Sequence, residues 1–248
     1  MPSKDDVAEN LPEDLLGLVP TAQEILRALG GNVHRYAIDT TFIRAVDKVK
    51  YVASASPTTA HRFGPPLALM NADGTLPHTW LYLAFDAIVA SWESRMIKNN
   101  RGAGKGFHVT LKAEQAGLLA TIRFARELRM WNLSDDHFSR LGVADIISNR
   151  DHYACHWLGL RVRQAMMMLP AVDRPDGFIY PSRIVKGQQA LVIADWAVDD
   201  LFRNAKIDTK PFRGSDTYRR YMNDPMRTAA PEASDRPENP REYDADQL

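Results

Sequence analysis

The sequence predicts a mixed fold in which short β-strands and helices surround a single core. Three observations support this prediction: short apolar runs recur along the chain, helical spacing of apolar residues is confined to a few segments, and no internal repeat is visible. The chain has 248 residues, of which 45% are hydrophobic and 25% are charged. These values are typical of a globular protein, and the length allows one large domain or two small ones.

The first expected element is a helix near the N-terminus. Apolar residues recur at helical spacing along 11–29, with an interruption at Pro20. Thr21 is followed three residues later by Glu24, which is the pattern of a capping box. Gly30 and the glycine after it are expected to end the helix.

A compact domain is expected to follow, from about residue 33 to residue 212. Apolar runs predict strands at 41–45, 51–53, 80–84, 107–111, 178–180 and 190–194. Helical spacing predicts helices at 87–98, 152–168 and 196–204. Asp86 is placed to cap the first of these helices, and Pro170 to end the second.

The segment 118–133 fits two interpretations. Leu118, Ile122 and Leu128 have helical spacing, whereas Ile122 and Phe124 alternate with a charged residue as in a strand. Periodicity alone leaves both interpretations open.

Charge and cysteine content exclude several classes of protein. Lys+Arg and Asp+Glu both number 31, so the net charge is zero. This balance argues against nucleic-acid binding by bulk electrostatics and against a polybasic membrane-surface protein. Cys155 is the single cysteine, so the chain has no intrachain disulfide and a reducing compartment is expected. No targeting segment or membrane span is predicted. We expect a cytoplasmic protein, with a secreted effector without a signal peptide as the open alternative.

The C-terminal part of the chain has a different composition. Residues 224–248 contain four prolines and seven acidic residues against three arginines, so they are expected to be disordered. The remaining chain then carries a compensating positive excess, which suits an anionic ligand. We therefore expect an N-terminal extension with a short helix at 1–32, one catalytic domain at 33–212, and an acidic, proline-rich tail at 213–248.

Two motifs are weak indicators of chemistry. The segment 101–106 (RGAGKG) resembles a phosphate loop, but a glycine follows Lys105 where magnesium binding needs Ser or Thr, so a turn is favoured. His152, Cys155 and His156 have the spacing of metal ligands on a helix, but no further ligands accompany them, so no metal site is expected.

A stronger indication comes from five polar residues in apolar surroundings: Arg44, Arg62, Tyr82, Glu93 and Ser182. A buried Glu93 needs a cation or strong hydrogen-bond donors, and the two arginines are available for this. On spacing alone, a structural ion pair between Glu93 and one of these arginines is the favoured interpretation, with Ser182 as a turn residue.

Longer motifs around these residues resemble a known family. They are Ile43-Arg-Ala45, Arg62-Phe63, LYLA at 81–84 with ASWE at 90–93, LRMWNLS at 128–134, and DGFIYPSR at 176–183. Together they resemble the RES domain, the toxin component of bacterial Xre–RES toxin–antitoxin pairs. The resemblance covers roughly 42–202. It implies an α+β fold similar to the ADP-ribosyltransferase split-sheet core, with helices packed on the sheet, and it favours strands for 118–133.

The resemblance also implies an activity, the cleavage of the nicotinamide–ribose bond of NAD+ by glycohydrolysis or phosphorolysis. The implied catalytic residues are Glu93, Arg44 and Ser182. Glu93 would stabilise the ribosyl cation, Arg44 and Arg62 would bind the diphosphate or ribose, Tyr82 would stack on nicotinamide, and Ser182 would hydrogen-bond nicotinamide or its ribose. NAD+ is the substrate, and no metal or further cofactor is expected.

The implied partner is an Xre-type antitoxin, and self-association into a homo-oligomer is left open. Neither nucleic acid nor a membrane is an expected direct partner. The alternatives are an ADP-ribosyltransferase that modifies a protein target and a non-catalytic binding module of RES shape.

Overall fold

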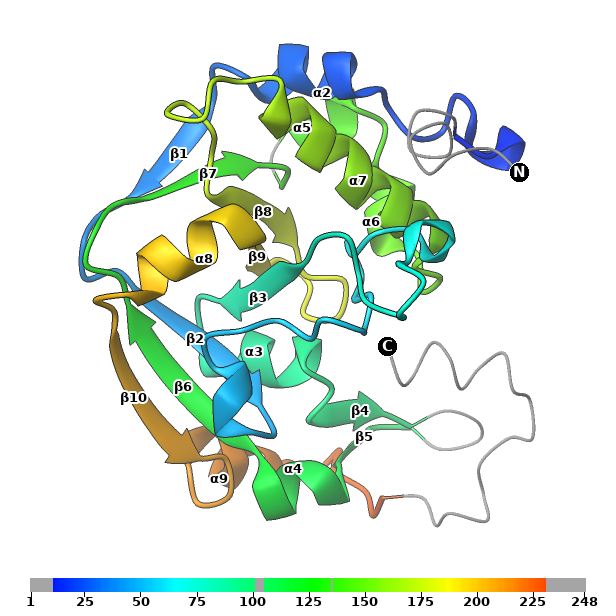
Figure 1. The fold of residues 1–248 in the computed structure, drawn as a ribbon. Helices are drawn as coiled ribbons and strands as arrows, with labels where there is room; N and C mark the ends of the chain where they lie inside the picture. Colours follow the sequence, from blue (N-terminus) through cyan, green and yellow to red (C-terminus); the bar gives the residue numbers. More distant parts are fainter. Residues whose placement is uncertain (1–10, 101–104, 135, 231–248) are drawn as a thin grey trace.

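The computed structural model describes residues 11–100, 105–134 and 136–230 (Figure 1). Within these residues the chain forms a curled eight-stranded sheet and a separate two-stranded one. In spatial order the large sheet contains β1 (Val33–Tyr36), β7 (Leu128–Asn132), β8 (Gly177–Pro181), β9 (Gln189–Ala194), β3 (Trp80–Ala84), β2 (Thr41–Val46), β6 (Leu118–Arg123) and β10 (Lys206–Pro211). The small sheet pairs β4 (Ile97–Asn99) with β5 (Phe107–Val109).

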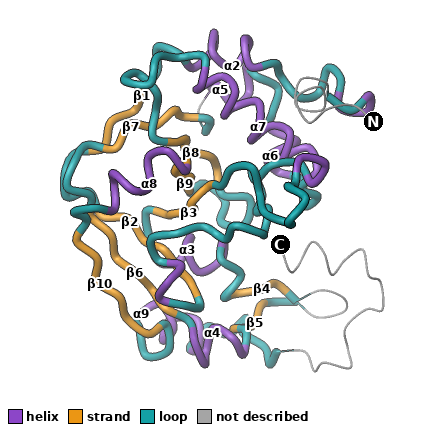
Figure 2. Tube along the Cα trace, in the orientation of Figure 1, coloured by secondary structure: helices purple, strands orange, loops and turns teal. Residues whose placement is uncertain are grey.

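Helices and short 3-10 turns connect and cover these strands (Figure 2). The α-helices are α2 (Ala22–Leu29), α3 (Ala87–Glu93), α4 (Leu111–Ala116), α5 (Asp136–Arg140), α6 (Ala144–Ser148), α7 (Tyr153–Met167), α8 (Asp195–Phe202) and α9 (Asp216–Met222). The 3-10 turns are η1 (Glu13–Leu15), η2 (Val49–Tyr51) and η3 (Leu67–Leu69). The mixed content confirms the predicted α+β class. None of the helices in the described parts of the chain is both long and apolar enough to cross a bilayer.

The large sheet is narrow at one point. β7 and β8 are parallel and the other neighbours are antiparallel. β2 and β3 share a single registered pair, Ile43 with Ala84, whereas the other neighbouring strands pair over three or more residues. This junction divides the sheet into two parts, β1-β7-β8-β9-β3 and β2-β6-β10.

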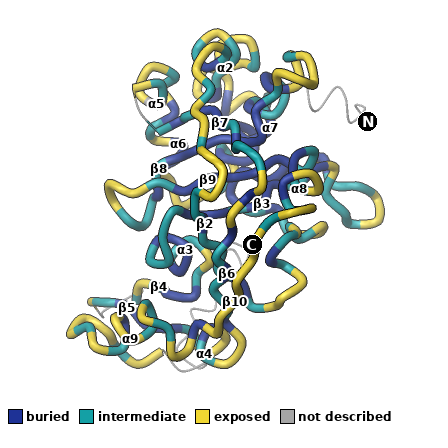
Figure 3. Tube along the Cα trace, turned by 90° about the vertical axis from the view of Figure 1, so that its left-hand side faces the viewer, coloured by how far each residue is buried: buried dark blue, intermediate teal, exposed yellow. Residues whose placement is uncertain are grey.

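The central strands are buried on both faces (Figure 3). Because successive side chains of a strand point to opposite faces, Phe178 and Tyr180 join the core under α2 and α7, whereas Ile179 joins the core under α8. Helices therefore cover both faces of the sheet where β8 and β9 lie. This packing fixes the end of β8, where Ser182 follows.

The N-terminal helix begins as predicted. Thr21 and Glu24 form the expected capping box, in which each side chain accepts the other's backbone N–H. Ile25 and Leu29 are fully buried in the core shared with α7. The segment expected as an extension at 1–32 is thus part of the domain from Leu15 onward, and residues 1–10 lie outside the described part of the chain.

The acidic tail was predicted to begin at residue 213, but the folded part of the chain extends beyond that residue. Residues 213–230 are folded: α9 lies within this stretch, and Tyr221 is buried against Trp92 and Phe107. Farther on, the Thr228 N–H donates to the Phe107 carbonyl at 2.8 Å. Aromatic residues at 218 and 221 therefore extend the core beyond residue 212, and 231–248 lie outside the described residues.

The strands predicted at 41–45, 80–84, 178–180 and 190–194 are confirmed, and 118–133 contains two strands. One prediction is wrong and two are wrong in part. The strand expected at 51–53 is replaced by η2, the one at 107–111 ends at Val109 because Thr110 caps α4, and the helix at 87–98 ends at Glu93. Ile97 therefore lies in β4, beyond the end of the helix.

Candidate functional site

Glu93 is the last residue of α3, a short helix held at a fixed place beside the sheet. Asp86 caps it as predicted, since its Oδ1 accepts the Val89 N–H at 2.8 Å. Ser94 ends the helix, and Arg95 then takes the left-handed conformation with φ of 60°. The chain turns sharply here, which leaves the half-buried Glu93 side chain at the helix end.

The Glu93 carboxylate contacts two hydroxyl groups from the end of β8. Ser182 Oγ donates to Glu93 Oε1 at 2.5 Å, and the Tyr180 hydroxyl lies 3.4 Å from Oε2. Ser182 is 4% exposed, and its Oγ also accepts the Val185 N–H at 3.1 Å, which fixes the hydroxyl. Burial, with Glu93 nearby, raises the pKa of Tyr180, so its phenol stays protonated and can donate. Glu93 and Ser182 are thus brought together as the resemblance implies.

Tyr82 lies on β3 beside this pair. Its hydroxyl accepts the Phe63 N–H at 2.8 Å, and its ring packs edge-on at 6.5 Å from that of Tyr180. Burial raises the pKa of Tyr82, which keeps it neutral. The ring of Phe63, the residue after Arg62, lies 4.9 Å from that of Tyr180. The predicted Tyr82 and Arg62 therefore belong to the same cluster.

Neither arginine makes the ion pair that spacing alone favours. Among the described residues, Arg44 and Arg62 form no salt bridge with Glu93. Arg62 is 7% exposed and donates from Nη2 to the Asn149 carbonyl at 3.2 Å. Its buried Nε has no hydrogen-bond partner in the described part of the chain.

Arg44 has a different environment. It donates to three backbone carbonyls: Nε to Tyr51 at 2.7 Å, Nη1 to Tyr82 at 2.6 Å and Nη2 to Ser54 at 3.0 Å. Burial lowers the pKa of Arg44 to about 10, which leaves it charged at neutral pH. The guanidinium therefore connects the loop after β2, which contains Tyr51 and Ser54, with β3, which contains Tyr82, by hydrogen bonds at the narrow junction of the sheet. This geometry gives Arg44 a positioning role next to Tyr82.

Two further arginines lie near Glu93 and were not singled out from the sequence. Arg183 directly follows Ser182 and its buried Nε has no partner among the described residues, and Arg95 comes two residues after Glu93. Burial and the charge of Arg62 lower the pKa of Arg183. The sequence signal for Arg183 is its place as the last residue of the DGFIYPSR motif.

The histidines beside the cluster are neutral. Burial, with Arg44 nearby, lowers the pKa of His61 to about 4, and burial with Arg62 nearby lowers that of His152 to about 3. Burial also lowers the pKa of His156 to about 4. Cys155, between the last two, hydrogen-bonds from Sγ to the Ile146 carbonyl at 3.1 Å. Most of the predicted phosphate-loop motif, 101–104, lies outside the described residues.

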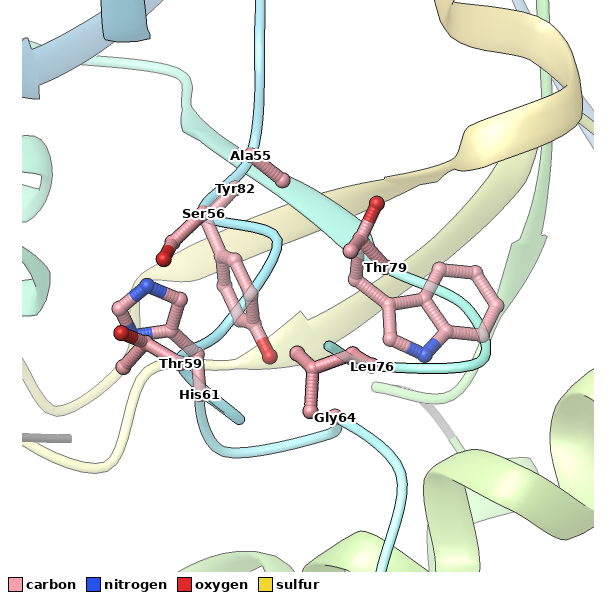
Figure 4. Close-up of a pocket in the computed structure, with 9 residues that line it drawn as sticks. Ala55, Ser56, Thr59, His61, Gly64, Leu76, Thr79 and Tyr82 are labelled. Carbon is pink, nitrogen blue, oxygen red and sulfur yellow. The ribbon is translucent and has the colours of Figure 1, made fainter. Parts of the chain in front are cut away.

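Two hollows among the described residues lie beside strands of the large sheet. Figure 4 shows the smaller one around the Tyr82 side chain, lined also by Ser56, His61 and Thr79. Its volume is about 10 Å³. That is space for about one water molecule. The larger, about 440 Å³, is an open hollow at the far end of β8 beside Asp176. Its Asp176 is already paired with Arg126, so we place the candidate site at Glu93 and not there.

Comparison of the chain with protein-family models, with curated proteins and with solved structures finds no match. The functional interpretation therefore depends on the residues and their geometry.

Proposed function

We propose that this protein is an NAD+-consuming enzyme that cleaves the bond between nicotinamide and ribose. The observation that carries the proposal is the Glu93 carboxylate, held by the Ser182 hydroxyl at 2.5 Å and close to arginines that do not neutralise it. The RES-like motifs around these residues support the same activity. Such an enzyme acts where NAD+ is abundant, in the cytoplasm.

The proposed reaction needs one carboxylate and no metal. The C1′–N bond breaks, nicotinamide leaves as a neutral molecule with the bonding electron pair, and the ribose acquires positive charge. Glu93 stabilises that charge and orients a water molecule. Water adds to C1′ and loses a proton, giving ADP-ribose, nicotinamide and H+. Ser182 and Tyr180 hold the carboxylate in place, and Ser182 also reaches nicotinamide or its ribose.

The remaining residues of the cluster bind and position the substrate. Tyr82 offers its ring to the planar nicotinamide, because its hydroxyl is already engaged by the Phe63 N–H. Arg62 has an unused donor and supplies positive charge for an anionic substrate. Arg44 acts indirectly, by fastening the loop beside Tyr82.

The test is product analysis after incubation of the purified chain with NAD+, with and without phosphate. Release of nicotinamide with ADP-ribose indicates hydrolysis, and a phosphorylated ADP-ribose indicates phosphorolysis. Label transfer from NAD+ to a protein supports the ADP-ribosyltransferase alternative. No release and no transfer under any condition contradict the proposed activity.

The toxin role has a separate test. Expression in bacteria should stop growth and lower cellular NAD+, and co-expression of an Xre-type antitoxin should restore both. Growth arrest with unchanged NAD+ would contradict the proposed route to toxicity.

A further inference from the structure

The short helix α3, which ends at Glu93, lies between the large sheet and the small one (Figure 1). Its Val89 and Ala90 belong to the core under α2 and α7. Ile88 and Trp92 are four residues apart and so share one face of the helix, and they pack on a third core formed by β4, β5, α4 and α9. A helix of seven residues is marginal by itself, so these two cores determine where α3 ends.

The third core is completed from the C-terminal side of the chain by Tyr221 on α9. Tyr221 is buried, and its ring packs edge-on at 6.2 Å from that of Trp92 and at 5.6 Å from that of Phe107. Its hydroxyl lies 3.4 Å from the Ile88 carbonyl oxygen. Tyr221 therefore contacts α3 twice, through the backbone of its first turn and through the residue that directly precedes Glu93.

After α9 the chain returns to the small sheet and pairs with β5. The Phe107 N–H donates to the Met226 carbonyl at 3.2 Å, and the Thr228 N–H donates to the Phe107 carbonyl at 2.8 Å. The Asn100 side-chain amide donates to Thr228 Oγ1 at 2.5 Å. Residues 213–228, which we call the C-terminal strap, thus hold both α3 and the small sheet.

Gly106, the last residue of the RGAGKG segment, makes this pairing possible. A Cβ atom at Gly106 would lie 2.1 Å from the Met226 carbonyl oxygen, and its φ of 99° also favours glycine. Backbone approach of the strap therefore explains the glycine after Lys105. The same glycine is what makes the segment unsuitable as a phosphate loop.

We propose that the C-terminal strap positions the Glu93 carboxylate, with Tyr221 as its central positioning residue. The strap fixes Trp92, and the next residue then reaches the Ser182 hydroxyl at 2.5 Å. A misplacement of about 1 Å in a reacting group can lower a rate about a hundred-fold, so the strap acts on kcat more than on KM. This inference deepens the proposed function and, in its catalytic part, rests on it.

The experiment compares Tyr221→Ala with Tyr221→Phe in the full chain. In Tyr221→Ala, kcat for nicotinamide release should fall about ten- to a hundred-fold with KM nearly unchanged. Tyr221→Phe keeps the ring and should restore most of the activity. Leu201→Ala is the matched control, because it also removes a buried side chain but from the core under α8. Its kcat per folded molecule should equal that of the unaltered chain.

Hydrogen exchange followed by mass spectrometry gives a readout that does not depend on activity. Within α3 and its ends, the Ala90 N–H donates to the Asp86 carbonyl and the Ser94 N–H to the Ala90 carbonyl. These amides should exchange about ten-fold faster in Tyr221→Ala, because local opening becomes easier when the packing on α3 is lost. They should exchange at nearly the unaltered rate in Tyr221→Phe and in Leu201→Ala.

Gly106→Ala perturbs the strap without removing a core side chain, and it covers the case in which Tyr221→Ala does not fold. It should give the same faster exchange and the same fall in kcat. Gly142→Ala should give neither, because Gly142 is an exposed glycine with φ of 67° and open space around it.

Two results would overturn the positioning role: unchanged exchange of α3 in the strap variants that fold, or faster exchange with unchanged kcat. If the unaltered chain does not cleave NAD+, the proposed function fails by itself. The exchange rates alone then decide for or against the strap as the support of α3.

Discussion

A carboxylate lies at each end of β8, the buried Asp176 before the strand and the half-buried Glu93 beside its far end, and the two have opposite electrostatic surroundings. Before the strand, Asp176 accepts two hydrogen bonds from Arg126 and one from the Arg129 N–H, all at 2.8–2.9 Å. After the strand, Glu93 contacts hydroxyl groups, and the Nε atoms of Arg62 and Arg183 have no hydrogen-bond partner in the described part of the chain. One carboxylate is fully paired, and the other is not.

This is the difference expected between a structural network of charges and a candidate binding site. The Asp176 network satisfies its own charges, and its bonds to Arg126 raise the pKa of that arginine, so it behaves as a fixed part of the fold. At the other end, Arg62 and Arg183 each keep a buried Nε without a hydrogen-bond partner among the described residues, and such unpaired donors cost stability. The larger of the two hollows described above lies at the Asp176 end, away from the candidate site.

The largest expected effect is on activity. Glu93→Gln should reduce nicotinamide release from NAD+ by about a thousand-fold, because it removes the charge that stabilises the ribosyl cation. The unfolding midpoint in urea should hardly change. Glu127→Gln, an exposed glutamate paired with Arg35, is the matched control and should keep full activity. Undiminished turnover in Glu93→Gln would remove Glu93 from the mechanism.

A substitution at Asp176, before β8, should change the free energy of unfolding and leave the reaction chemistry unchanged. Asp176→Asn should lower the free energy of unfolding by about 3 kcal/mol, since it breaks a buried, charge-assisted network. Urea unfolding followed by circular dichroism measures this. Asp200→Asn removes the exposed partner of Arg126 and should cost less than about 1 kcal/mol. Equal costs in both variants would contradict the view that burial makes the Asp176 network important.

Ser182→Ala should have an intermediate effect on turnover. Loss of the 2.5 Å bond leaves the Glu93 carboxylate less well positioned, and we expect kcat to fall about ten- to a hundred-fold. Ser148→Ala, an exposed serine on α6, should behave like the unaltered chain. If KM alone rises, Ser182 contacts the substrate and does not position Glu93.

The smallest effect concerns pH. Burial lowers the pKa of His78 and His156 to about 4, whereas the unfolded value is about 6.5. Between these values the unfolded chain binds more protons, so stability falls as pH drops from 6.5 towards 4 and is constant above that range. At pH 5.5 each of these histidines should lower the free energy of unfolding by about 1 kcal/mol relative to neutral pH. In His156→Gln the urea unfolding midpoint should depend less on pH between pH 7 and pH 5 than in the unaltered chain. An equal dependence on pH would contradict the assignment to His156.

The sequence predicts the buried central elements well. The apolar runs at 80–84, 178–180 and 190–194 are strands because their side chains must be buried on both faces. The edge strands were missed. β1 contains His and Arg, and β10 is exposed throughout, so both owe their conformation to pairing with β7 and β6. Such pairing joins residues far apart in the sequence and leaves no local pattern.

The site was predictable in part for a similar reason. Glu93 and Ser182 are found because motifs surround them, and the structure places them in contact. Arg95 has no motif: its place depends on the early end of α3, which the apolar pattern through Ile97 concealed. The engagement of Arg44 with carbonyls also depends on tertiary structure, since its acceptors come from three segments.

The narrow junction between β2 and β3 makes the sheet unusual in its construction. A sheet is normally continuous because backbone groups pair along its whole length, and no single side chain decides whether it holds. Here one registered pair remains, and the bond from Arg44 to the Tyr82 carbonyl supplies a further connection across the same gap. A side-chain hydrogen bond thus stands where a backbone hydrogen bond between strands is usual. A single substitution at Arg44 would therefore remove a connection between β2 and β3. Backbone pairing at the same place would not depend on which residue is present.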